Sequence, residues 1–185
     1  MGRGRAGAPR RVRGDRLTIP LPIETERLRI RPFEPADLDP MSGIYGDPEV
    51  MRHICLGVLD RDGTAALLDD YRRGQDERGF STWAVVEKET QAVVGDVGFG
   101  LYAPTAEPEL GYTLATEVWG RGYALEAARA CVEAAFAHLP HRRLVVKVEP
   151  ENERSLRLAD RLGMRTVDTI SVDGRPHLLL ALERA

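Results

Sequence analysis

The chain has 185 residues, of which 43% are hydrophobic and 30% charged, and its formal net charge is −3. This length suits one domain with a buried core, and the composition excludes a disordered, collagen-like or disulfide-rich protein. No apolar run approaches the about 20 residues that a transmembrane helix needs, so we expect a cytoplasmic protein that does not act in a membrane.

The beginning of the chain differs from the rest in charge. Residues 1–16 contain six arginines and one aspartate, so their formal charge is +5 and the remaining residues carry −8. We interpret residues 1–20 as a basic tail without stable structure and residues 21–185 as the folded domain, with an RNA- or ribosome-contacting arm as the alternative for the tail. The acidic body argues against a nucleic-acid partner and favours a cationic amine or peptide.

The first half of the domain reads as one strand, three helices and two more strands. Alternating apolar residues from Ile23 predict a strand that ends at Pro32. Helices are predicted over residues 37–45, after Asp47-Pro48, and over residues 62–78 with Gly79 as the stop. Strands over residues 81–87 and 92–101 then form an antiparallel meander with the strand that follows them.

The second half alternates strands and helices. It comprises a strand over 109–115, a helix from 125 to 139, a strand over 144–149, a helix from Asn152 to Gly163, and two final strands joined at Asp173-Gly174. The seven strands and five helices predict an α/β (α+β) domain with helices on both faces of a sheet. Cys55 and Cys131 have no partner at metal-ligand spacing, so we expect two buried free thiols and no metal site.

A glycine-rich turn precedes the strongest helix, with the sequence Trp119-Gly120-Arg121-Gly122-Tyr123-Ala124. Two glycines let a ligand touch the main chain, and the following helix points unpaired N–H groups toward the turn. Such a turn can bind a phosphate or pyrophosphate, because the helix N-terminus also carries a partial positive charge. The alternative is a tight strand-to-helix turn that binds nothing.

The wider pattern resembles the acetyl-CoA signature of the GNAT N-acetyltransferases, and most of all their Rim-type branch, which acetylates the N-terminal residue of ribosomal proteins. The resemblance rests on Glu-Leu-Gly-Tyr from Glu109, the glycine-rich turn, Glu126-Ala127, and Asn152-Glu153-Arg154-Ser155 with Leu162-Gly163-Met164. The opening Glu-Thr-Glu-Arg-Leu from Glu24 is also Rim-like. The similarity covers roughly residues 23 to 183, and one departure is Glu117 where the family has Gln or Arg.

The resemblance implies the GNAT fold, a twisted and mainly antiparallel seven-stranded sheet whose fourth and fifth strands are parallel and splay apart. It implies acetyl-CoA as the cofactor, with the pyrophosphate on the N–H groups of residues 120–124 and pantetheine paired with the main chain of Leu114. The cofactor-binding residues that it implies are Leu114, Trp119, Gly120, Arg121, Gly122, Tyr123, Ala124, Asn152 and Ser155.

Catalysis needs a base for the amine and a proton for the departing thiolate. Glu109 is the first candidate for the base, with Asp96, Glu107 and His177 as weaker ones. Many GNAT enzymes protonate the thiolate with a tyrosine, but spacing puts Ala159 at that position, so Ser155 is the candidate donor.

We therefore predict an N-acetyltransferase that moves an acetyl group from acetyl-CoA to a primary amine, a protein or peptide N-terminal α-amine, by direct attack in a ternary complex. Two alternatives stay open: a small-molecule amine acceptor such as an antibiotic or polyamine, and a non-catalytic acyl-CoA-binding sensor. A homodimer is also left open.

Overall fold

The computed structural model describes residues 18–184, and within that range it contains eight strands, five α-helices and two 3-10 helices. The strands are β1 (Ile23–Glu24), β2 (Leu28–Arg31), β3 (Thr82–Glu87), β4 (Val93–Tyr102), β5 (Glu107–Leu114), β6 (Arg143–Val148), β7 (Arg165–Val172) and β8 (Arg175–Glu183). The helices are η1 (Pro35–Asp37), α1 (Leu38–Tyr45), α2 (Pro48–Met51), α3 (Arg61–Arg78), η2 (Thr116–Val118), α4 (Tyr123–His138) and α5 (Glu153–Arg161).

All eight strands belong to one sheet, in the order β1-β2-β3-β4-β5-β6-β8-β7. The expected number of seven strands is wrong, because the first predicted strand is a hairpin of two. Its turn is closed at Thr25, whose N–H and hydroxyl both donate to the carbonyl of Leu28, at 2.9 and 3.1 Å. Alternation of apolar residues alone could not reveal this turn, since Ile23 and Ile30 are cross-strand partners on the same face.

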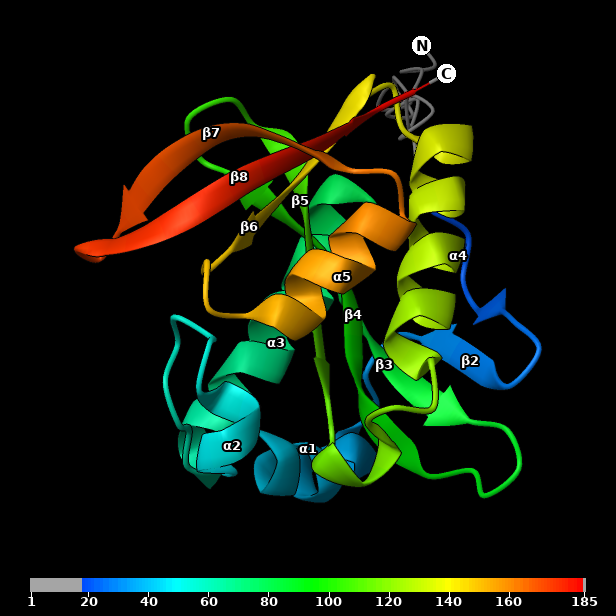
Figure 1. Cartoon of the computed structure of the whole chain (residues 1–185). Coiled ribbons are helices and arrows are strands. Elements are labelled where there is room, and N and C mark those ends of the chain that lie inside the picture. Colours follow the sequence, from blue (N-terminus) through cyan, green and yellow to red (C-terminus); the bar gives the residue numbers. More distant parts are fainter. Residues whose placement is uncertain (1–17, 185) are drawn as a thin grey trace, which may run out of the picture.

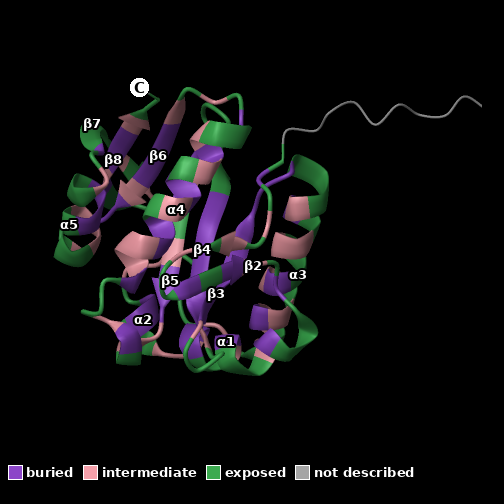
Figure 2. Cartoon of the chain, turned by 90° about the vertical axis from the view of Figure 1, so that its right-hand side faces the viewer, coloured by how far each residue is buried: buried purple, intermediate pink, exposed green. Residues whose placement is uncertain are grey.

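Helices cover both faces of the sheet, as expected, with α4 and α5 on one side and α1 to α3 on the other (Figure 1). Successive residues of β3 divide between the two faces: Trp83 and Val85 pack in the core beneath α4, and Ala84 in the core beneath α1 and α3. Every residue of β3 is buried, whereas β7, at the edge, is exposed along most of its length (Figure 2).

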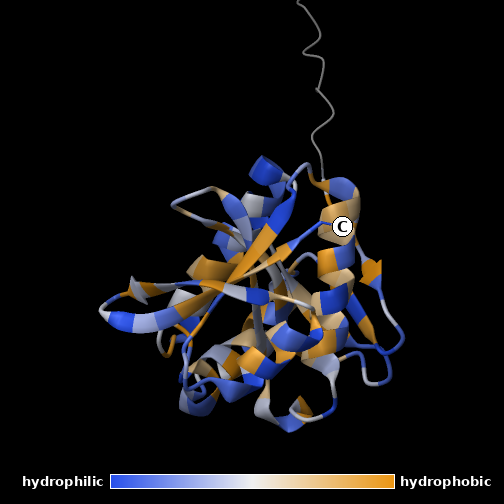
Figure 3. Ribbon diagram, turned by 45° about the horizontal axis from the view of Figure 1, so that its top comes forward, coloured by the Kyte–Doolittle hydropathy of each residue, from blue (hydrophilic) through white to orange (hydrophobic). Residues whose placement is uncertain are grey.

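Helix α4 supplies most of the contact with the first of these cores. Its buried residues are small for the most part, so the helix lies close to the sheet: Tyr123, Ala127, Ala128, Cys131, Val132 and Ala135. Its outer face carries the exposed Arg129 and Glu133, and hydrophobic and hydrophilic segments alternate along it (Figure 3). This amphipathic division is the one that the three- and four-residue spacing predicts.

The sheet opens between β5 and β6. These two strands are parallel, and among the described residues only Glu109 and Val145 are paired between them. On its other side β5 pairs with β4 along its whole length. The expected splay between the fourth and fifth predicted strands is therefore confirmed, and it leaves one edge of β5 open beyond Glu109.

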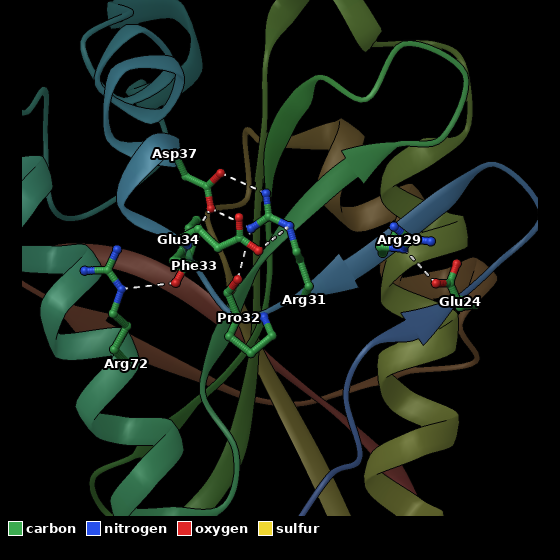
Figure 4. A network of polar contacts seen from close by, with 8 residues as sticks. All are labelled: Glu24, Arg29, Arg31, Pro32, Phe33, Glu34, Asp37 and Arg72. Carbon is green, nitrogen blue, oxygen red and sulfur yellow. Dashed lines mark hydrogen bonds and ion pairs between the residues drawn. The ribbon is translucent and has the colours of Figure 1, made fainter.

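A buried ion pair fixes the start of the helical layer on the sheet. The guanidinium of Arg31, at the end of β2, donates to both carboxylate oxygens of Asp37, at 2.6 and 2.9 Å (Figure 4). Asp37 also accepts the N–H of Glu34, and Arg72 of α3 donates to the carbonyl of Phe33. These contacts join β2, η1 and α3, and they set the position of the helices that border the site described below.

Three further expectations concern the ends of the chain and the cysteines. The predicted basic tail lies almost wholly outside the described residues, but Ile19 is 1% exposed and its N–H donates to the carbonyl of Gly79. Cys131 is buried as expected, whereas Cys55 is exposed, because it lies in the loop after α2 and not in a strand or helix. Among the described helices none is long and apolar enough to cross a membrane.

Candidate active site

The glycine-rich turn has the backbone of an anion-binding loop. Gly120 and Gly122 both adopt a left-handed conformation, with φ of 77° and 82°, which residues with a Cβ rarely take. Gly122 is the N-cap of α4, and among the described residues no side chain caps this end of the helix. The first N–H groups of α4 are therefore left for a ligand, together with the partial positive charge of the helix.

Neighbouring side chains hold this turn from behind. Arg27 donates to the carbonyl of Arg121 at 2.9 Å and to the carboxylate of Glu126, and it stacks on the ring of Tyr123 at 4.6 Å. The Tyr123 hydroxyl donates to Glu87 at 2.5 Å, so this side chain points away from a ligand on the turn. The conformation of the turn is thus fixed by the protein before any ligand arrives.

Arg121 is the member of the predicted phosphate site with the least support from the geometry. Its N–H donates to the carbonyl of Val118 at 3.4 Å, and its guanidinium lies 3.6 Å from Glu87. It also does not line the cavity described next. The other predicted members of the turn do line that cavity.

A cavity of about 680 Å³ begins at this turn and follows the open edge of β5 toward α5. It is lined by eight of the residues expected to bind the cofactor: Leu114, Trp119, Gly120, Gly122, Tyr123, Ala124, Asn152 and Ser155. The indole of Trp119 donates to the carbonyl of Leu114 at 2.8 Å, and Arg154 stacks over the same ring at 4.2 Å. Arg157 and Arg161 of α5 add further positive charge to the lining.

A second cavity, of about 270 Å³, adjoins the first along β5. It is lined by polar and aromatic side chains from many parts of the chain, among them Tyr45, His53, Tyr71, Asp96, Glu109, Glu149 and His177. The two cavities share a set of lining residues: His53, Ile54, Tyr112, Thr113, Asn152 and Ser155. A ligand in one cavity can therefore meet a ligand in the other at this junction.

Ser155 is held at the junction by the start of α5. Asn152 caps this helix, and its side-chain oxygen accepts the N–H of Ser155 at 3.1 Å. The Ser155 hydroxyl is also hydrogen-bonded to the phenol of Tyr112, whose pKa is raised by burial, an effect that this bond partly offsets. Ala159, at the position where the resemblance implies a tyrosine, is buried in the same helix, and Tyr112 from β5 lines both cavities.

The sequence profile of the Acetyltransferase (GNAT) domain family matches residues 27–165. The chain belongs to the GNAT acetyltransferase family. It is 32% identical over 149 residues to an uncharacterized N-acetyltransferase, p20, of Bacillus licheniformis, covering 77% of this chain and 82% of that protein. The solved structure of an acetyltransferase from Agrobacterium tumefaciens is similar with a TM-score of 0.78 and 27% identity, and the match covers 98% of this chain and 100% of that one.

Two GNAT structures with coenzyme A share the fold at lower identity. One is RimL, a ribosomal L7/L12 alpha-N-protein acetyltransferase, with 14% identity and a TM-score of 0.76, covering 89% of this chain and 98% of that one. The other is a spermidine N-acetyltransferase from Vibrio cholerae, with 16% identity and a TM-score of 0.72, covering 86% and 97%. The expected family and fold are thus confirmed, and GNAT members of this fold act on protein and on small-molecule amines alike.

In this GNAT domain, Glu109 lies in the second cavity and not in the first. Its carboxylate is 3.2 Å from the ammonium group of Lys147, a residue of the neighbouring strand β6. Burial raises the pKa of Glu109, and Lys147 opposes that shift. The expected base therefore lines the second cavity, but it already has a cationic partner.

Asp96 is the most strongly perturbed carboxyl group of the second cavity. It is 3% exposed, and burial raises its pKa to about 7, although hydrogen bonds with Tyr45 and Thr113 lower it in part. The Tyr45 hydroxyl donates to Asp96 at 2.8 Å. A group that changes charge near neutral pH in a cleft is typical of a functional site.

Two further residues at the cavities of this acetyltransferase are not among the catalytic candidates that the sequence suggests. Tyr112, part of the Glu-Leu-Gly-Tyr motif, lines both cavities, and Glu149, 3% exposed, lines the second one directly after β6. His177 does lie in the second cavity, as the weaker sequence hypothesis has it, with its Nε2 3.7 Å from the sulfur of Cys55. Glu149 could have been singled out from the sequence, because it follows the apolar residues of β6 directly and a buried carboxylate needs a partner.

Proposed function

We propose that this protein transfers the acetyl group of acetyl-CoA to a primary amine by direct attack in a ternary complex, and that the amine is the N-terminal α-amine of a peptide or protein. The observation that carries the proposal is the pair of cavities that share Tyr112, Thr113, Asn152 and Ser155. A thioester held in the first cavity and an amine held in the second would meet there in reacting distance, which removes much of the entropic cost of the encounter.

The first cavity supports the cofactor half of this proposal. The main chain from Gly120 to Ala124 would hold the pyrophosphate, and the open edge of β5 at Leu114 would pair with the pantetheine amides. Trp119 and the α5 arginines would contact the remainder of the coenzyme. Bound there, acetyl-CoA supplies an activated acetyl group, and every further requirement falls on the chain's own side chains.

The two catalytic side chains that we propose lie on either side of the transferred group. Ser155, supported by Tyr112, would donate a proton toward the departing sulfur, which needs only modest help because a thiol has a pKa near about 8.5. Glu109 would attract the acceptor's ammonium group in the second cavity and is a candidate to take its proton. Ser155 lines the shared junction, and Glu109 lines the second cavity beside it.

The rim of the second cavity favours a peptide over a small amine. Leu56, in the lining, and Val58, two residues further on, are each 54% exposed. An apolar surface beside the cavity would pack against residues that follow the acetylated one, whereas a small polyamine has nothing to place there. A small-molecule amine is the second candidate, because the spermidine enzyme has the same fold.

The test is a panel of peptides with different N-terminal residues and of small amines, each mixed with protein and acetyl-CoA and followed by release of free thiol. The proposal expects turnover with at least one peptide that is blocked when its N-terminus is formylated. Turnover with polyamines or antibiotics alone would replace the acceptor, and slow hydrolysis of acetyl-CoA with every amine would instead favour a non-catalytic sensor.

A further inference from the structure

One imidazole lies between the two cavities. His53 follows α2 and lines both of them, and its side chain is 27% exposed. Its Nδ1 is 2.7 Å from Oε2 of Glu149, a residue at the end of β6 that is almost completely buried. A histidine oriented by a buried carboxylate at the meeting point of two substrate cavities is an arrangement that moves protons in many enzymes.

The contacts of Glu149 indicate which nitrogen of His53 carries the proton. The guanidinium of Arg175 is 2.7 Å from Oε1 of Glu149, and Nδ1 of His53 is near Oε2. A carboxylate only accepts hydrogen bonds, so Nδ1 of His53 is the donor. In the neutral ring Nε2 then has a free lone pair, and this nitrogen is the one that Glu149 leaves for another partner.

The carboxylate that the sequence suggests as the base is less suitable. Glu109 is in an ion pair with Lys147 and lines the second cavity only. A proton on the attacking amine has to leave at the junction, where the nitrogen meets the thioester. Of the two groups only His53 lines both sides of that junction.

We propose that His53, positioned by Glu149, is the general base for the acceptor amine, an assignment that rests on the acetyl transfer proposed above. Nε2 takes one proton from the ammonium group, and the freed lone pair forms the C–N bond to the acetyl carbon while the C–S bond breaks with its electrons on sulfur. As the amide forms, Ser155 gives its proton to the sulfur and is reprotonated by the second proton that leaves the nitrogen. His53 returns its proton to solvent, and Glu149 stabilises the imidazolium in the interval.

Several other charged or titratable groups from neighbouring elements face this part of the cavity and contribute to its pH dependence. They are Glu109 of β5, Lys147 of β6, Arg175 and His177 of β8, Asp96 of β4 and Cys55 of the loop. For this reason the test compares variants at the same pH values and does not assign a single titration to His53.

The first experiment measures turnover of the best amine from the panel by the parent, His53→Gln, Glu149→Gln and Glu109→Gln over pH 6 to 9. We expect His53→Gln to lower kcat roughly a hundredfold at pH 7, a loss that shrinks as pH rises and free amine becomes plentiful. Glu149→Gln is expected to lower kcat at least about tenfold, since a glutamine amide can bind either tautomer of His53 and no longer holds Nε2 unprotonated. Glu109→Gln is expected to act mainly on the KM of the amine, and His138→Gln, at the exposed end of α4, is the control.

A second measurement needs no turnover. The nitrogen chemical shifts of His53 in the free protein report which ring nitrogen is protonated, and we expect the Nδ1–H tautomer in the parent and a mixture of tautomers in Glu149→Gln. A purely structural role of Glu149 would leave the tautomer unchanged. Affinity for acetyl-CoA, measured by calorimetry, is expected to stay within about threefold in both variants, because His53 acts on the amine.

The possible results separate this assignment from the proposed function. If no amine is acetylated by the parent, the proposed function is wrong and this assignment falls with it. If the parent is active and folded His53→Gln keeps its kcat within about twofold at pH 7, only the assignment is wrong. A full loss in Glu109→Gln with retained tautomer and activity in Glu149→Gln would give the role of base to Glu109.

Discussion

The two cavities along β5 are built in different ways. The larger one includes a main-chain surface, made by the left-handed glycines, the uncapped start of α4 and the open edge of β5. The smaller one is lined by residues that converge from α1, the loop after α2, α3 and strands β3, β4, β5, β6 and β8. A cavity made of backbone can bind one constant ligand through a short motif, whereas a cavity made of side chains can change its ligand residue by residue.

The largest expected effect concerns the larger cavity and the binding of acetyl-CoA to its glycine-rich turn. Gly120→Asp and Gly122→Asp place a negative charge where a phosphate would approach, so we expect affinity for acetyl-CoA to fall at least about a thousandfold in calorimetry. The positive φ of both glycines makes each substitution cost some stability, but a Cβ at Gly120 meets nothing within 4 Å and one at Gly122 only Arg27, at 3.5 Å, so the fold should persist.

The matched control for these variants is Gly174→Asp, in the turn between β7 and β8. Gly174 has a similar φ of 78° and equally open surroundings, so it carries the same backbone strain away from the site. Equal affinity of the folded Gly120→Asp or Gly122→Asp protein and the Gly174→Asp protein would show that the turn does not bind the pyrophosphate.

The second-largest effect concerns the smaller cavity and the contribution of the buried Asp96 to the free energy of unfolding. Because the pKa of Asp96 is about 7 in the folded protein and about 3.8 in the unfolded chain, the folded state holds the proton more strongly. Its contribution to stability is complete below pH 3.8 and is lost as pH rises through 7, a difference of roughly 4 kcal/mol. Asp96→Asn should remove this dependence.

The measurement is the free energy of unfolding in urea between pH 4 and 8, for the parent and for Asp96→Asn. As pH rises, the free energy of unfolding of the variant should increase relative to that of the parent. Glu133→Gln, an exposed carboxyl on α4, should follow the parent at every pH. Parallel curves for the parent and Asp96→Asn would mean that Asp96 is ionised throughout this range.

A smaller effect is expected at Ser155, where the two cavities meet. Ser155→Ala should lower kcat about tenfold and leave the affinity for acetyl-CoA unchanged, because a contact with the departing sulfur strengthens only in the transition state. Ser171→Ala, on the exposed strand β7, is the control. Loss of affinity without loss of kcat would make Ser155 a binding residue of the larger cavity only.

The smallest effect is expected from the basic tail. Among the described residues the lining of both cavities begins at Tyr45, and we expect deletion of residues 1–16 to change kcat/KM for a peptide by less than about twofold. Thiol release by the parent and the shortened chain is the measurement. A large loss that is restored by adding the missing segment as a peptide would show that it contributes to the acceptor site.

The same contrast explains what could be predicted from the sequence. Most residues of the larger cavity lie in two segments, 112–125 and 152–161, which contain the sequence motifs, and the others come from residues 49–54. The smaller cavity depends on the packing of α1 to α3 against the sheet, and it joins residues as distant as His53 and Glu149. No local pattern could show that contact. The hairpin at Thr25 and the exposure of Cys55 were also missed, since neither a tight turn nor an exposed loop position changes the periodicity of the apolar residues.

The unpaired edge of β5 also links the ligand to the folding equilibrium. Backbone groups inside a protein are normally paired, and here the neighbouring strand leaves after a single residue pair. A coenzyme that pairs with this edge takes the place of a missing strand, so the folded state becomes more stable as the ligand becomes more abundant. At a concentration a hundred times its Kd, that stabilisation is about 2.7 kcal/mol. The lifetime of this protein against unfolding and proteolysis would then rise and fall with the supply of its own acyl donor.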